Sequence, residues 1–119
     1  MGKGSEDSPF SMAEIAYQSF YNRVDLFKYL WSGFWREPGA EKETRIHPTQ
    51  KPIKLYEWIL GKYAKPGQKI FDSHLGSGSS AIAANNMGFE FVGCELDVDY
   101  YNTAFKRVAQ YARQERLFA

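Results

Sequence analysis

The sequence predicts an α/β domain in which parallel strands alternate with helices. From residue 52 onward the segments follow the order helix, strand, helix, strand, helix. One strand-like segment ends at Asp72 and enters a glycine turn, and the next one ends at Glu95. Alternation of this kind gives parallel strands joined by right-handed crossovers, and ligands then bind beyond the carboxyl ends of the strands.

The first third of the chain has less regular patterns. Residues 1–11 are polar and glycine-rich, so we expect a flexible terminus, with residues 12–119 forming a single domain. Aromatic runs over 15–21 and 26–31 predict two strands, arranged as a hairpin, with most of their rings in the core. Residues 37–45 predict an exposed charged loop.

A helix, a strand and a second helix follow. Pro52 suits the first turn of a helix with apolar residues along one side, and Lys65-Pro66-Gly67 ends it. A strand over 69–72 leads through the glycine turn to a helix over 79–87, which Gly88 closes.

A strand over 90–95 and a final helix capped by Asp97 complete the predicted order. Cys94 is expected to be a buried small residue of that strand. The apolar stripe of the final helix comprises Tyr101, Ala104, Phe105, Val108 and Ala112.

Composition narrows the function classes. A single cysteine excludes an internal disulfide. The 119 residues have a net charge of only +1, so the basic surface typical of a free-standing nucleic-acid binder is missing. No apolar run is long enough for a membrane span, so we expect no membrane partner and a cytoplasmic location. His47 and His74 have no partners at ligand spacing, and no metal is expected.

The glycine turn indicates a nucleoside cofactor. Gly76 and Gly78 let the backbone approach a ligand closely, and Glu95 suits the hydroxyls of a ribose. Asp72 at the mouth of the turn would repel a pyrophosphate but attract an ammonium or sulfonium group. Both cations occur in S-adenosylmethionine, which is therefore favoured over a dinucleotide.

A third segment, His47-Pro48-Thr49-Gln50-Lys51-Pro52, precedes the first long helix. Together with the loop over 72–80 and Gly93-Cys94-Glu95-Leu96-Asp97, it resembles the C-terminal half of the amino-methyltransferases that act on DNA. The likeness is greatest to the small adenine-N6 enzymes of bacteria and their phages, and covers about residues 12–110. It implies a partial Rossmann-like, S-adenosylmethionine-dependent methyltransferase fold, with DNA as the partner.

The resemblance also implies the site. Glu95 would bind the ribose hydroxyls, and Lys51 would lie near the methionine carboxylate of the cofactor. Ser73, His74 and Ser79 stand where the family usually has Pro, Phe and Thr. The implied cofactor-binding residues are Asp72, Ser73, His74, Gly76, Gly78, Ser79, Glu95, Thr49, Gln50, Lys51 and Pro52.

The family binds the target base with an Asp-Pro-Pro-Tyr or Asn-Pro-Pro-Tyr segment, and here no two of the five prolines are adjacent. We therefore expect an incomplete sheet that lacks the strand carrying this segment, no catalytic residues and no activity of the chain alone. Exposed apolar surface should then favour self-association or pairing with a separate N-terminal half. The alternatives are a non-catalytic regulatory fragment that binds cofactor or DNA, and a fragment of a nicotinamide-dependent oxidoreductase. Adenine and cytosine-N4 targets are not distinguished by the residues present.

Overall fold

The computed structural model describes residues 14–29 and 50–118, with side chains through residue 114. The predicted flexible terminus over 1–11 and the predicted charged loop over 37–45 lie outside these residues.

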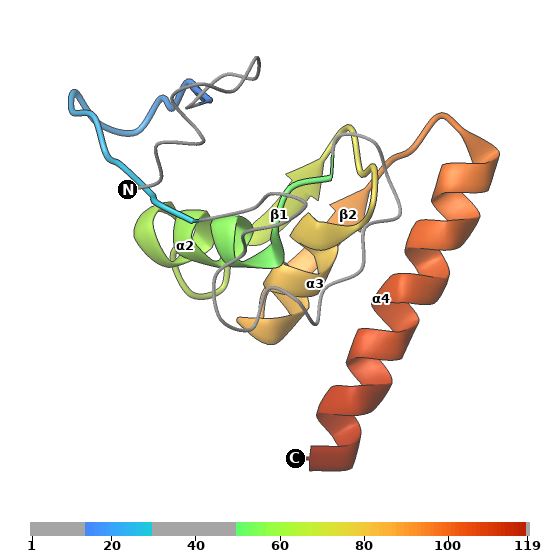
Figure 1. The fold of residues 1–119 in the computed structure, drawn as a ribbon. Coiled ribbons are helices and arrows are strands. Elements are labelled where there is room, and N and C mark those ends of the chain that lie inside the picture. Colours follow the sequence, from blue (N-terminus) through green and yellow to red (C-terminus); the bar gives the residue numbers. More distant parts are fainter. Residues whose placement is uncertain (1–13, 30–49, 119) are drawn as a thin grey trace, which may run out of the picture.

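The five elements predicted after residue 52 are present in the predicted order. They are α2 (Ile53–Tyr63), β1 (Lys69–Asp72), α3 (Ser79–Asn86), β2 (Glu90–Gly93) and α4 (Val98–Phe118). The strands are parallel, in a register that pairs Lys69 with Glu90 and Asp72 with Gly93 (Figure 1). The second strand ends two residues before Glu95, and a bond from the N–H of Cys94 to the backbone oxygen of Asp72 at 3.0 Å extends the pairing one residue past it.

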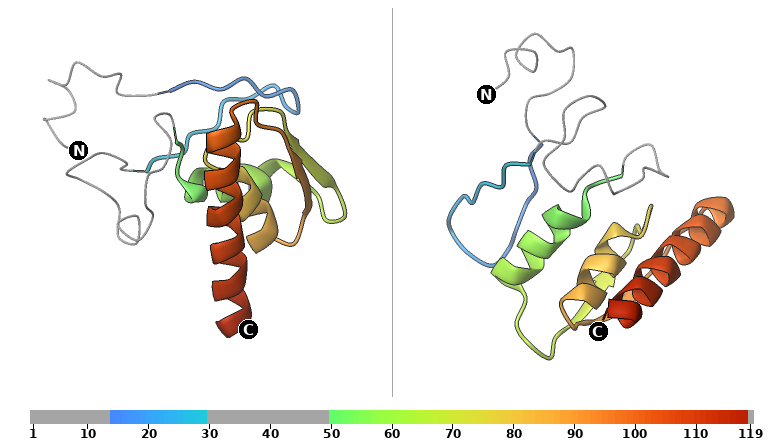
Figure 2. Two further views of the ribbon diagram at one scale, coloured as in Figure 1. Left: turned by 90° about the vertical axis from the view of Figure 1, so that its right-hand side faces the viewer. Right: turned by 60° about the horizontal axis from the view of Figure 1, so that its bottom comes forward.

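The three helices lie side by side in one layer against the small sheet (Figure 2). The central helix α3 packs against α2, β2 and α4. Its small side chains are almost wholly buried, which lets the neighbouring elements approach closely. The buried cluster consists of Ile53, Leu60, Ile82, Ala83 and Ala84, with Ile70 and Phe91 packed against it from the strands.

The opposite face of the sheet is open. Side chains alternate along a strand, so Ile70 and Phe91 point to the helices while Phe71 and Val92 point away from them. Phe71 is 65% exposed and Val92 is 49% exposed. The exposed apolar surface expected from the sequence is therefore present.

The predicted hairpin is wrong in its described part, because residues 14–29 contain no strand. The Gln18 side chain accepts hydrogen bonds from the backbone N–H groups of Phe20 and Tyr21 and donates to the backbone oxygen of Arg23. These local bonds take backbone groups that a strand ladder would need. The rings pack on α2 at the surface, with Phe20 stacked on Tyr63 at a centroid distance of 5.5 Å and still 61% exposed.

Two expectations for the end of the domain also need correction. Cys94 is exposed because, by the alternation of side chains, it lies on the same open face as Val92. In α4, Ala104 is buried, whereas Tyr101 and Phe105 are exposed and stack on each other. The helix packs through Ala104 and Val108 of the predicted stripe together with Arg107, which is only 6% exposed.

Candidate functional site

The candidate site is the loop between β1 and α3, at the carboxyl edge of the sheet. Gly76 and Gly78 have φ angles of 58° and 84°, a left-handed conformation that side chains other than glycine rarely adopt. The N–H of Gly78 donates to the backbone oxygen of Leu75 at 3.0 Å, which closes the turn. Gly78 is also the N-cap of α3 and has no side chain to cover the first N–H groups of that helix.

Asp72 anchors the start of this loop. Its Oδ2 accepts a hydrogen bond from Ser80 Oγ at 2.5 Å, and its Oδ1 accepts one from the N–H of His74 at 3.0 Å. Short bonds of this kind to a carboxylate are the stronger class of hydrogen bond. The Asp72 carboxylate is thus held by both ends of the loop. Ser73 and His74 are exposed, and Ser73 Oγ lies 2.8 Å from His74 Nδ1.

Glu95 closes the loop from the side of β2. Its Oε1 accepts a hydrogen bond from the N–H of Gly76, and its Oε2 accepts one from the N–H of Asp97, both at 2.9 Å. A second connection runs from the N–H of Leu75 to the backbone oxygen of Cys94 at 2.8 Å. Two backbone donors therefore fix the orientation of the Glu95 carboxylate beside the glycine turn.

The segment that enters α2 comes close to the same loop (Figures 1 and 2). Gln50 is 5% exposed and Pro52 is buried as the N-cap of α2. Lys51 forms an ion pair with Glu14 at 2.8 Å. Thr49 lies outside the described residues.

Tyr56 on α2 provides an electrostatic indication of this proximity. Burial raises the pKa of its hydroxyl, and the negative charges of Asp72 and Glu14 raise it further. Asp72 is therefore near enough to α2 for its charge to act on Tyr56.

The structure thus brings together the loop residues from Asp72 to Ser79, Glu95 and the segment from Gln50 to Pro52. Sequence reasoning missed three contributors: Ser80, Tyr56 and Arg107. Ser80 had a usable signal, because it lies in the first turn of the helix that follows the glycine loop, eight residues after Asp72. Arg107 did not, because an arginine inside an apolar stripe normally extends its head to solvent.

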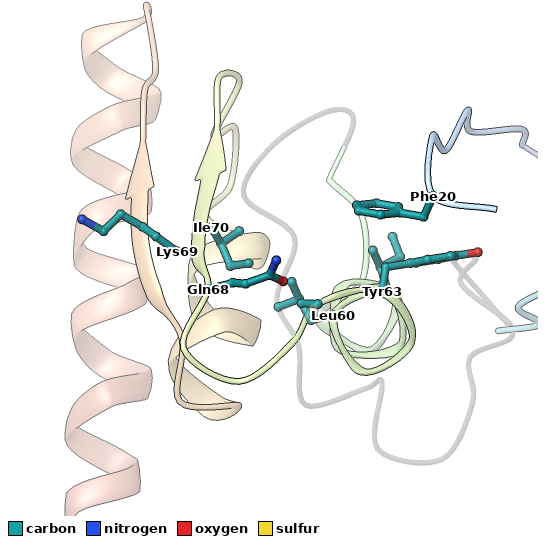
Figure 3. Close-up of a pocket in the computed structure, with 8 residues that line it drawn as sticks. Phe20, Leu60, Tyr63, Gln68, Lys69 and Ile70 are labelled. Carbon is teal, nitrogen blue, oxygen red and sulfur yellow. The ribbon is translucent and has the colours of Figure 1, made fainter.

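A separate cleft of about 460 Å³ lies between α2 and the start of β1 (Figure 3). Its lining includes Phe20, Leu60 and Ile70. The cleft is at the amino end of β1, whereas Asp72 and the glycine turn are at the carboxyl end. It is therefore distinct from the candidate site.

Within the described ranges, no three His, Cys, Asp or Glu residues are grouped so as to hold a metal ion. Among the helices of the same ranges, none is long and apolar enough to cross a membrane.

The candidate site is a backbone turn with two oriented carboxylates, Asp72 and Glu95, next to it. Such a site suits a ligand that combines hydroxyl groups with positive charge.

Comparisons with known proteins all indicate similarity to DNA methyltransferases. A family model described as DNA methylase, of the N6/N4 type, matches residues 7–106. The type II methyltransferase M2.DpnII of Streptococcus pneumoniae is 36% identical over 97 residues, which cover 74% of this chain and 36% of that protein. The type II methyltransferase M2.LlaDCHI of Lactococcus lactis subsp. cremoris is 32% identical over 88 residues, covering 74% of this chain and 32% of that protein.

Among solved structures, the complex of M1.HpyAVI with SAM is similar at 33% identity and a TM-score of 0.52. The similarity covers 73% of this chain and 42% of the M1.HpyAVI chain. The chain therefore spans about one third of the length of the curated relatives it matches.

Proposed function

The chain belongs to the DNA methylase family, and from that premise we propose that it is the cofactor-binding portion of a methyltransferase that modifies the exocyclic amine of adenine in DNA. The predicted partial methyltransferase fold is confirmed by the similarity to the solved M1.HpyAVI structure, which covers 73% of this chain. The single observation that carries the proposal is the hydrogen bond from the Gly76 N–H to Glu95, which joins two family motifs in one site.

The residues at the loop fit S-adenosylmethionine by their chemistry. When bound, this cofactor supplies a methyl group on a positively charged sulfur. The Asp72 carboxylate favours positive charge at the mouth of the turn, and Glu95 is oriented to accept hydrogen bonds from hydroxyl groups. Gly76 and Gly78 have left-handed φ angles that only glycine adopts readily, and this turn geometry lets the loop bring its backbone close to a ligand. Gln50 and Pro52 would form the adjoining wall.

Methyl transfer also requires a site for the target base, which in this family contains adjacent prolines. The sequence has none, so we propose that the base-binding residues lie outside these 119 residues and that the chain alone is inactive. The open face with Phe71 and Val92 would accept the remaining methyltransferase half. Within the described residues each strand has one partner, which leaves an edge for additional strands.

A second candidate is a non-catalytic module that binds the cofactor or DNA without transferring a methyl group. The absence of the proline-containing segment favours it. The first candidate and the cofactor-binding form of the second predict binding of S-adenosylmethionine, whereas a nicotinamide-dependent enzyme predicts binding of NAD.

The test has two steps. In the first, the full chain is titrated calorimetrically with S-adenosylmethionine, its demethylated product and NAD. We expect binding of the first two ligands only, and binding of NAD alone would overturn the proposal.

In the second step, an N-terminal methyltransferase half is added with DNA and radiolabelled cofactor. Labelling of adenine in the mixture, absent from either half alone, supports the catalytic proposal, while a mixture that associates without labelling DNA favours the non-catalytic module.

A further inference from the structure

Arg107 is a buried cation on α4 that contacts the glycine loop on both sides of Gly78. Its side chain is 6% exposed, although it lies in a long helix with many exposed positions. Arginine is seldom buried this far unless its donors are satisfied. The contacts of its guanidinium therefore indicate why it is buried.

One guanidinium nitrogen bonds to both residues that flank Gly78. Arg107 Nη1 donates to the backbone oxygen of Ser77 and to Ser79 Oγ, each at 3.0 Å. Ser77 and Ser79 are also 3.1 Å apart through their own hydroxyl oxygens. The guanidinium thus spans the left-handed residue of the turn and fixes the chain on both sides of it.

The neighbouring side chains of α4 make this contact rigid. A Cβ atom at Gly78 would lie 2.9 Å from Val108 Cγ2 and 3.5 Å from Ala104 Cβ, so the helix packs directly beneath the turn. The Arg107 guanidinium also lies 5.5 Å from the ring centroid of Tyr111, a contact that further restricts its orientation. Arg107 is therefore confined by the same helix face that supports the loop.

We propose that Arg107 is a positioning residue of the cofactor loop. It acts through Ser77 and Ser79 to hold Gly78 in its left-handed conformation, so that the loop backbone is already arranged for the ligand. The identity of the ligand in this inference rests on the proposed function. The effect of Arg107 on the conformation of the loop is independent of that proposed function. The loop is therefore supported by an element that follows β2 in sequence and whose Ala104 and Val108 also pack beneath the turn.

The test compares Arg107→Met and Arg107→Lys with Arg113→Met, which removes an exposed arginine from the same helix. In the full chain without ligand, amide hydrogen exchange is measured at Gly76 and Gly78, with Cys94 as the reference for strand pairing. We expect exchange at the two glycines to rise roughly tenfold or more in Arg107→Met, since hydrogen bonds to a charged group are lost. Arg107→Lys should restore part of the protection, and Arg113→Met should leave it unchanged.

Calorimetric titration with S-adenosylhomocysteine gives the second readout. We expect affinity to fall roughly tenfold in Arg107→Met and by less in Arg107→Lys. If the original chain does not bind this ligand, the proposed function fails, while the exchange measurement still decides the role of Arg107. Unchanged exchange at Gly76 and Gly78 in Arg107→Met would overturn the inference. If Arg107→Met does not fold, the exchange measured in Arg107→Lys decides the role of Arg107. Equal loss of protection at Cys94 and at the two glycines in Arg107→Lys would also overturn the inference.

Discussion

The Oε1 atom of Glu95 lies 2.9 Å from the backbone nitrogen of Gly76, across 19 residues of sequence. This bond joins the end of β2 to the loop that follows β1, in addition to the pairing between the strands. The carboxylate therefore has a structural role even before a ligand is considered.

Replacing Glu95 should weaken cofactor binding. In Glu95→Gln the charge that orients the Gly76 and Asp97 N–H groups is lost, and we expect at least a roughly tenfold loss of affinity for S-adenosylhomocysteine in calorimetry. Glu90→Gln is the matched control, because Glu90 lies on the exposed side of β2, where it forms an ion pair with Lys69. Equal affinities of Glu95→Gln and the original chain would contradict the assigned role.

Gly78 should tolerate a methyl group less well than Gly67. Both have left-handed φ angles, 84° and 88°, so alanine carries a backbone cost of about 1–2 kcal/mol at either position. A Cβ at Gly67 has no atom within 4 Å, whereas one at Gly78 meets Val108 Cγ2 at 2.9 Å. Urea unfolding should therefore show a further loss of about 1–3 kcal/mol for Gly78→Ala. Adding Val108→Ala should recover part of that difference, and equal effects at both glycines would count against the packing described.

The bond between Ser80 and Asp72 should be visible in a double-mutant cycle. In Asp72→Ala the Ser80 hydroxyl, whose residue is 6% exposed, loses its acceptor, and we expect a loss of about 1–3 kcal/mol in the free energy of unfolding. Ser80→Ala alone should be milder, because the half-buried carboxylate retains the N–H of His74. Strictly additive effects of the two changes would show that the bond contributes nothing to stability.

The segment over 14–29 should stay attached to α2 only within a defined pH range. Tyr63 donates a hydrogen bond to Asp25 at 2.6 Å, which lowers the pKa of Asp25 and raises the pKa of Tyr63. The contribution of Asp25 is present above its unfolded pKa of about 4 and is lost as pH falls through the lowered folded value. The contribution of Tyr63 is present below ~10 and is lost as pH rises through the raised value.

The ring signals of Phe20 in an NMR titration report this attachment, because Phe20 stacks on Tyr63. We expect them to remain constant between about pH 4 and 10 and to change outside that range. Tyr63→Phe should abolish the transition at high pH. An identical transition in that variant would assign it to another group.

The sequence predicted most of the fold after residue 52 because local signals and tertiary packing agree there. Pro52, the glycine turn and Asp97 each mark a boundary that the structure confirms within one residue. The predictions failed where contacts with residues distant in sequence determine the conformation or the burial of a side chain. Phe20 and its neighbours have strand-forming side chains, but their backbone groups bond locally and their rings pack on α2. Arg107 could not be predicted, because only the packing of α4 against the loop shows where its donors bond.

An NMR titration of the full chain with S-adenosylhomocysteine tests the central claim most directly. The account predicts saturable shifts of backbone signals from Gln50 to Pro52, from Asp72 to Ser80 and at Glu95, while the cleft lined by Phe20, Leu60 and Ile70 stays unchanged. Shifts confined to that cleft, or a folded chain whose spectrum does not respond to the ligand, would contradict it.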